Sequence, residues 1–172
     1  LTLEQYLSTL ADEAQPLRHA EMLCLSSLTQ EEMNLLKRRW RNIEAERRQG
    51  VLSRLVEIAE ANLDTDFDGL FVFCLADEDP FVRAKAIEGL WECDDRTLIT
   101  PFTGMLGSDP SGKVRAAAAQ ALGKFAVLAQ SGKMLEKDGE KILETLIRTI
   151  ETAGEEQDVR RRAIEAVAPL GT

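Results

Sequence analysis

Apolar residues recur along this chain at spacings of three and four positions, which is the period of an amphipathic helix. Residues 140–152 show the pattern clearly, with Ile142, Leu146 and Ile150 on one side. The same reasoning predicts helices over residues 3–13, 16–26, 30–41, 44–62, 66–76, 82–92 and 96–106. Thr29 followed by Glu32 forms a capping-box signal before one of them. No segment shows the strict alternation of a half-buried strand, so we predict an all-α protein.

Three stretches of the chain are near copies of one another. They are Val-Arg-Ala-Lys-Ala-Ile-Glu-Gly-Leu at 82–90, Val-Arg-Ala-Ala-Ala-Ala-Gln-Ala-Leu at 114–122 and Val-Arg-Arg-Arg-Ala-Ile-Glu-Ala-Val at 159–167. A weaker fourth copy lies at 46–55. Their shared arginines, Arg48, Arg83, Arg115 and Arg160, are separated by intervals of 35, 32 and 45 residues. We attribute the longest interval to an extended connection over residues 130–139.

Each strong copy places small and aliphatic residues on one side of its helix. At 100° per residue, positions 82, 86, 87 and 90 span about 140°, and position 89 borders this arc. The arginine also falls inside the arc, where a buried charge needs a carboxylate partner. The acids before each helix supply candidates, so we predict a structural ladder made of three pairs: Asp79 with Arg83, Asp109 with Arg115, and Glu156 with Arg160.

The motif Asp-Pro-Phe-Val-Arg-Ala-Lys-Ala-Ile-Glu-Gly-Leu at 79–90 resembles the second helix of a HEAT repeat. The short period is similar to that of the phycobilisome-lyase HEAT-like repeats. This resemblance covers residues 30–172. It implies a right-handed α-α superhelix, an α-solenoid of stacked helical hairpins, with an acid–arginine ladder through the inter-repeat turns. The copies depart from the family pattern at Ser111–Lys113, which is inserted, and at Glu156, which replaces Asp-Pro.

The repeat pattern divides the chain into two parts. We expect residues 1–28 to form an N-terminal capping helical hairpin and residues 29–172 to form an array of about four HEAT-like repeats. The last residues, 168–172, are typical of a helix end before another hairpin. We therefore expect the array to continue beyond this segment or to be truncated there.

Composition excludes several classes of protein. The chain has 172 residues, 44% of them hydrophobic, and a formal net charge of −9, which suits a folded acidic domain. The net negative charge of the chain opposes nucleic-acid binding, because the phosphate backbone is also negative. The longest apolar run, residues 70–76, is too short for a membrane span. Cys24, Cys74 and Cys93 form no CxxC pair, so we expect a reducing, cytoplasmic location without disulfide or metal.

Residues of the types that usually form catalytic sites are scarce in this sequence. His19 is the single histidine, and the His-Glu pairs of iron-using HEAT-like hydroxylases are absent from the sequence. HEAT-like DNA glycosylases need a basic groove, whereas residues 63–109 carry eleven acids against three bases. We therefore predict a protein that is not an enzyme and has no cofactor. The resemblance keeps one alternative open, a phycobilin-lyase-like or small-ligand-binding regulatory subunit.

A basic cluster lies over residues 37–48, where six lysines and arginines surround Trp40. Such a cluster can bind a phosphate backbone or an acidic peptide. Alternatively, it is a solvated helix face whose bases pair with neighbouring glutamates while Trp40 lies in the core. Trp91, which replaces a small residue of the other copies, is either a binding anchor or a gap filler.

Solenoids bind partners along the surface made by their successive second helices. On the wheel, the side opposite the apolar arc is polar and differs between copies. Its residues are Lys85, Glu88, Glu92, Gln120, Lys124, Arg161, Arg162 and Glu165. We predict that this surface binds another protein and that the chain is a scaffold for protein–protein interaction.

Overall fold

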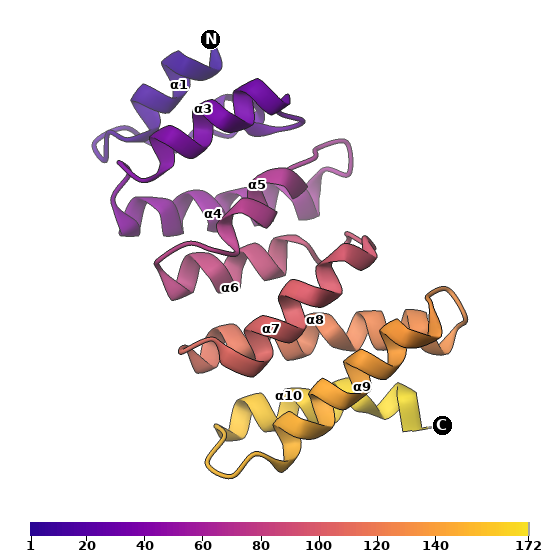
Figure 1. The fold of residues 1–172 in the computed structure, drawn as a ribbon. Helices are drawn as coiled ribbons and strands as arrows, with labels where there is room; N and C mark the ends of the chain where they lie inside the picture. Colours follow the sequence, from indigo (N-terminus) through magenta and orange to yellow (C-terminus); the bar gives the residue numbers. More distant parts are fainter. Residues whose placement is uncertain (172) are drawn as a thin grey trace. The chain divides into compact units, whose positions relative to one another are not determined.

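A computed structural model describes residues 1–171 of the chain, and within them the regular secondary structure is entirely helical (Figure 1). The first helices are α1 (Leu3–Leu10), α2 (His19–Met22), α3 (Gln30–Trp40), α4 (Ala45–Ala61), α5 (Asp68–Cys74) and α6 (Pro80–Gly89). They are followed by α7 (Ile99–Ser108), α8 (Gly112–Gln130), α9 (Glu136–Glu151) and α10 (Gln157–Val167). Short 3₁₀ turns lie at Leu23–Leu25, Arg96–Leu98 and Ala168–Gly171. The predicted all-α class, an α-solenoid of stacked helical hairpins, is confirmed.

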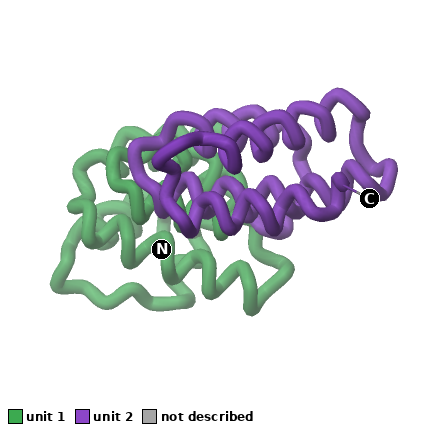
Figure 2. Tube along the Cα trace, turned by 90° about the horizontal axis from the view of Figure 1, so that it is seen from below, with its two compact units in different colours: residues 1–90 green, residues 91–172 purple. Residues whose placement is uncertain are grey.

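The chain divides into two compact units, residues 1–90 and residues 91–172 (Figure 2). In unit 1, α4 packs against α6 and α5 packs against α6. In unit 2, α8 packs against α7, α9 and α10. In both units, therefore, the second helix of one hairpin packs against the second helix of the next. The expected cap over residues 1–28 stays a prediction.

Local signals explain where several helices begin. The Thr29 hydroxyl accepts a hydrogen bond from the Glu32 backbone N–H at 3.3 Å, and the Glu32 carboxylate accepts one from the Thr29 N–H at 2.8 Å. The predicted capping box is therefore confirmed, and the hydrogen bonds that the Thr29 backbone N–H and hydroxyl donate to the Glu32 carboxylate lower the pKa of Glu32. Asp79 caps α6 by accepting from the Val82 N–H at 3.0 Å, with Pro80 at the first helical position.

The core of unit 1 is built from large side chains. Leu52 and Leu55 of α4 have no exposed surface, and Trp40 of α3 is buried. Phe71 of α5 lies against the backbone of α6 at Gly89, where an added Cβ would come within 2.6 Å of the ring. Gly89 is therefore the residue that lets these two helices approach.

The core of unit 2 combines large side chains, such as Phe102 and Phe125, with a row of small ones along α8. On α8, Ala118, Ala119 and Leu122 have no exposed surface, as the predicted arc requires. Gly123 faces α10 so closely that an added Cβ would lie 3.2 Å from the Cβ of Ala166. Small residues thus bring the α8 and α10 backbones together.

The connection predicted over residues 130–139 is wrong. Helix α8 continues to Gln130 and α9 already begins at Glu136, so the turn between them is short. Gly132, with φ of 72°, makes that turn, whereas Gly139 lies inside α9. The long arginine interval arises because α8 has 19 residues and α9 has 16.

Candidate functional site

The four repeated arginines share one local role. Each donates a hydrogen bond to a backbone carbonyl in the turn before its own helix: Arg48 to Ile43 at 3.2 Å, Arg83 to Asp77 at 2.9 Å, Arg115 to Asp109 at 2.8 Å and Arg160 to Thr152 at 2.9 Å. Carbonyls in such turns have no partner within a helix, so the guanidinium satisfies them. The arginine column therefore holds the inter-helix turn.

Arg48 and Arg115 also reach a carboxylate in the turn of the following hairpin. In unit 1, Arg48 of α4 lies 3.2 Å from the Asp77 carboxylate, and both side chains are buried. In unit 2, Arg115 of α8 donates two hydrogen bonds to Glu155, at 3.1 and 2.8 Å. The Arg115 hydrogen bonds lower the pKa of Glu155 and raise the pKa of Arg115. These ion pairs connect successive hairpins within each unit.

The three acids expected in the ladder lie near the arginines but make other contacts. Asp79 caps α6 and accepts a hydrogen bond from Gln49 at 2.9 Å. The Asp109 carboxylate accepts from the Ser111 N–H at 2.9 Å. Glu156 lies at the exposed edge of the Arg115 ion pair, 3.6 Å from its guanidinium. The shorter contacts to Arg48 and Arg115 are made by Asp77 and Glu155, which sequence proximity did not indicate.

Two of the predicted partner-binding residues lie on α6 in unit 1. The Lys85 ammonium is 2.8 Å from the Glu88 carboxylate and 6.0 Å from the centre of the Phe81 ring. Glu88 is exposed, and Phe81 is 39% exposed. This side of α6 therefore offers paired charges next to an accessible ring.

The predicted residues of α10 form an exposed charged network. Arg161 bridges Asp158 at 2.5 Å and Glu165 at 3.2 Å, and these contacts raise its pKa. Arg162 lies 3.7 Å from Glu165. Gln120 of α8 and Glu92 are also exposed.

Lys124 of α8 has a structural role. Its ammonium donates to the carbonyls of Trp91 at 2.6 Å and Cys93 at 2.7 Å, and it lies 3.1 Å from the Asp94 carboxylate. It also lies 4.8 Å from the centre of the Phe125 ring. These contacts anchor the segment before α7, and they leave Trp91 with 44% of its surface exposed.

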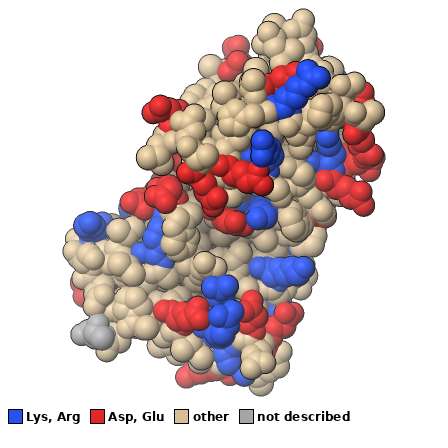
Figure 3. Space-filling view, turned by 180° about the vertical axis from the view of Figure 1, so that it is seen from behind, with Lys and Arg blue, Asp and Glu red and all other residues tan. Residues whose placement is uncertain are grey.

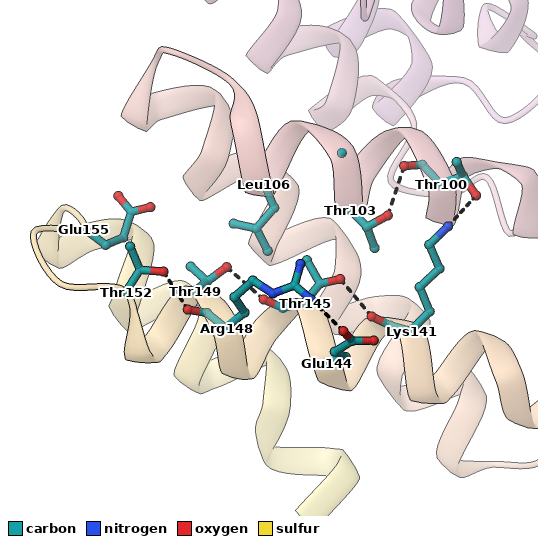
Figure 4. Close-up of a pocket in the computed structure, with 12 residues that line it drawn as sticks. Thr100, Thr103, Leu106, Lys141, Glu144, Thr145, Arg148, Thr149, Thr152 and Glu155 are labelled. Atoms are coloured by element: carbon teal, nitrogen blue, oxygen red, sulfur yellow. Dashed lines mark hydrogen bonds and ion pairs between the residues drawn. The ribbon is translucent and has the colours of Figure 1, made fainter.

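A groove of about 470 Å³ lies between α7 and α9 in unit 2 (Figure 4). Lys141 on its α9 side donates to the Thr100 hydroxyl at 2.9 Å, and Arg148 pairs with Glu144 at 2.6 Å. Its other lining residues are Thr103, Gly104, Leu106, Gly107, Thr145, Thr149, Thr152 and Glu155.

The threonines of this groove present oxygen lone pairs. The hydroxyls of Thr145, Thr149 and Thr152 each donate to the carbonyl four residues earlier. Their single protons are therefore used, and a ligand would meet acceptors. This groove was not predicted from the sequence. Gly104 and Gly107, at helical spacing, leave one wall open, because a Cβ at either position would meet open space.

The basic cluster of residues 37–48 is dispersed by the fold. Trp40 is buried and donates its indole N–H to Asp77 at 2.7 Å. Arg48 is in the buried ion pair, and Arg47 donates to the Leu10 carbonyl at 2.9 Å. Figure 3 shows positive and negative side chains intermixed on the face that it presents. Trp40 thus lies in the core, as the solvated-face interpretation expects, but Arg47 and Arg48 contact Leu10 and Asp77 instead of the neighbouring glutamates.

Within residues 1–171, no group of three or more His, Cys, Asp or Glu side chains is arranged to hold a metal ion. In the same range, none of the helices has both the length and the apolar character that a membrane crossing demands. Cys74 is buried, and desolvation raises the pKa of its thiol well above the ordinary value, so it packs as a small apolar residue.

Comparison with protein families supports the repeat assignment. A family model described as HEAT repeats matches residues 67–166, which is more than half of the chain. The match includes the first two strong copies of the arginine motif and all but the last residue of the third. No curated protein sequence matches the chain.

Proposed function

Because the chain belongs to the HEAT-repeat family, we propose that it is a non-catalytic scaffold that binds another protein through the polar side of its second helices. HEAT repeats commonly serve as interaction scaffolds, and repeat arrays bind along such surfaces. The contacts described above separate two classes of charge: arginines that hold the turns, and exposed charges that differ between copies.

The observation that carries the proposal is the exposed charged network of α10. Arg161, Arg162 and Glu165 satisfy one another at the surface, and none of them holds a turn. A partner of complementary charge can exchange these contacts without disturbing the core. Exposed ion pairs contribute at most about 1 kcal/mol to folding, so their replacement costs little stability.

A site-specific crosslinking experiment tests this proposal. A photoreactive amino acid at Glu165 is expected to capture a defined partner in cells that express the chain, whereas the same group at Glu144 on α9 serves as the matched exposed control. Reversing the charges of Arg161 and Arg162 should remove the crosslinked product. Equal capture from both positions, or capture that survives the reversal, would contradict the proposal.

A small-ligand function is the second candidate, and the α7–α9 groove favours it. A volume of about 470 Å³ lies in the range of ligand sites, about 300–1,000 Å³. Its threonine and charged lining lacks the aromatic surface that usually covers a tetrapyrrole. Titration with bilins should give a difference spectrum if the chain resembles the phycobilin lyases in function, and Gly104→Leu should remove it. A flat spectrum would dismiss this candidate.

We also propose a cytoplasmic location, which is supported by the unpaired spacing of the three cysteines.

A further inference from the structure

The groove between α7 and α9 presents hydrogen-bond donors and acceptors in alternation along its α9 wall. Lys141 and Arg148 supply donors, because each makes one hydrogen bond to a neighbouring side chain and keeps further N–H groups. Thr145 and Thr152 supply acceptors, because each donates its single hydroxyl proton to the carbonyl four residues earlier. In chain order, therefore, this wall offers a donor, an acceptor, a donor and an acceptor.

The formal charges of the groove lining cancel. Lys141 and Arg148 are balanced by Glu144 and Glu155. A phosphate, which only accepts hydrogen bonds, would leave the threonine oxygens without donors, and a polyamine would leave the lysine and the arginine without acceptors. An extended peptide satisfies both kinds of group, because every residue other than proline carries one N–H and one carbonyl. The chemistry of the lining therefore favours a peptide backbone.

The dimensions of the groove favour an extended peptide over a helical one. The α9 wall runs from Lys141 to Thr152, which is about 16 Å at a rise of about 1.5 Å per residue. An extended peptide of about five residues spans this length at about 3.3 Å per residue. A helix of the same length and about 10 Å across would occupy more than about 1,000 Å³. The groove holds about 470 Å³, so most of such a helix would lie outside it.

The α7 wall lets a backbone come close. Gly104 and Gly107 line the groove without side chains, and a Cβ at either position would meet open space. Figure 4 shows the labelled side chains of α9 on the opposite side of the groove from Thr103 and Leu106 of α7. A peptide backbone can therefore lie along the glycines while its edge faces the donors and acceptors of α9.

The described part of the chain does not supply an extended segment of this length. Between the helices of residues 1–171, the stretches without a turn or bend are at most three residues long, as at 16–18, 65–67 and 93–95. A second copy of residues 1–171 has the same short connections. The occupant of the groove is therefore a segment other than these residues.

We propose that the α7–α9 groove is a binding site for an extended peptide segment of about five residues that residues 1–171 do not contain. The N–H groups on one edge of the peptide donate to Thr145 and Thr152, and its carbonyls accept from Lys141 and Arg148. This site uses the first helices of the hairpins, so it does not rest on the proposed use of the second helices. It is also an alternative to a tetrapyrrole, because both ligands would occupy the same groove.

Selection from a peptide library tests the site. A random seven-residue library displayed on phage is selected on the immobilised full chain, and the affinity of the most enriched peptide is measured with a dye label by fluorescence anisotropy. We expect Gly104→Leu, which places a side chain in the groove, to weaken binding at least tenfold. Gly69→Leu on α5 is the matched control, because a Cβ at Gly69 also meets open space, and it should leave the affinity unchanged. Circular dichroism first establishes that both variants keep the helical spectrum.

Two further measurements test the hydrogen bonds of the proposed complex. Thr145→Val keeps the shape of the side chain and removes its acceptor, and we expect it to weaken binding at least threefold. Thr9→Val on α1 is the control, because the Thr9 hydroxyl makes the same bond to the carbonyl four residues earlier but lies outside the groove. N-methylation of the selected peptide at alternate residues should weaken binding at least tenfold for one of the two alternating sets, because only one edge of the peptide faces α9.

Several outcomes would overturn the proposal. They are the failure of any peptide to be enriched, equal weakening by Gly104→Leu and Gly69→Leu, indifference to both N-methylated sets, and a gain of helicity by the peptide on binding. Bilin binding that the peptide does not displace would also count against it. Charge reversal at Arg161 and Arg162 separates the two proposals: it should remove the scaffold interaction and leave the affinity of the peptide unchanged. Loss of peptide binding in that variant would place the peptide on the second helices instead.

Discussion

The interface between α4 and α6 in unit 1 and the interface between α8 and α10 in unit 2 use the same ionic contact with different packing. In each, an arginine of the earlier helix meets a carboxylate in the following turn. Asp77 also accepts from the Trp40 indole, whereas Glu155 is held by Arg115 through two charge-assisted bonds. The contact is retained although its surroundings differ.

The packing around these contacts differs in side-chain size. Unit 1 uses large residues, such as Trp40 and Leu52, and it needs a glycine only where Phe71 meets α6. Unit 2 uses alanines along α8 and the close approach of Gly123 to Ala166. The ion pair therefore determines which turn packs next to each arginine. Side-chain size determines how closely the two helices approach.

The largest expected effect comes from breaking the ionic contact of unit 1. Arg48→Ala leaves the Asp77 carboxylate buried without its charge partner, which should lower the free energy of unfolding by about 3–5 kcal/mol. Arg115→Ala should cost less, because the side chains of Arg115 and Glu155 are 16% and 9% exposed, against 10% and 4% for Arg48 and Asp77. Urea denaturation of the two variants measures the difference. A larger loss for Arg115→Ala would reverse the comparison.

The next effect tests the close approach of α5 and α6. Gly89→Ala places a Cβ against the Phe71 ring and should destabilise the chain by about 1–3 kcal/mol. Gly69→Ala on α5 is the control, because its Cβ meets open space, and this change should be neutral or stabilising. Thermal unfolding of both variants gives the answer. Matching melting temperatures would show that Phe71 moves aside without cost.

An effect of similar size separates turn-holding arginines from surface arginines. Arg83 donates to the carbonyls of Asp77 and Glu78, so Arg83→Ala should cost about 1–3 kcal/mol. Arg38 is exposed on α3, and Arg38→Ala should change stability by less than about 0.5 kcal/mol. Chemical denaturation compares them. Indistinguishable midpoints would argue against a structural role for the arginine column.

The smallest expected effect is on the pH dependence of stability, through two carboxylates of unit 2. The pKa of Glu155 is lowered by its hydrogen bonds with Arg115, and the pKa of Asp138 by its hydrogen bonds with Arg96. A carboxyl whose pKa is lower in the folded state contributes stability above its unfolded pKa, about 4. That contribution disappears as the pH falls through the lower folded value. Melting temperatures measured from pH 6 to pH 3 should therefore fall less steeply for Glu155→Gln than for the original chain, and parallel curves would contradict the assignment.

Much of the fold could be predicted from the sequence because it depends on neighbours along the chain. The Thr29–Glu32 capping box and the buried arc of Val82, Ala86 and Ile87 follow from helix geometry and from residue type. The same rules failed at residues 130–139, where glycines suggested a loop. Gly132 does make a turn, but Gly139 is held inside α9, where a Cβ would lie 3.3 Å from that of Ala129.

Less of the candidate site could be predicted from neighbours along the chain. The polar positions of α10 could be read from its wheel, but the role of Lys124 could not. Its ammonium is engaged by the carbonyls of Trp91 and Cys93, more than 30 residues away in the sequence. The α7–α9 groove likewise depends on two helices that are separated by all of α8.

The sequence by itself determined the helical repeat, the buried columns and the presence of an arginine in every copy, because periodicity and capping act within a few residues. Only the tertiary structure decided which carboxylate each arginine reaches. Sequence proximity paired Arg115 with Asp109 and assigned no acid to Arg48, whereas the turns bring Glu155 to Arg115 and Asp77 to Arg48. The physical reason is that an ion pair depends on distance in space, and residues 29 and 40 positions apart meet only when one hairpin has packed on the next.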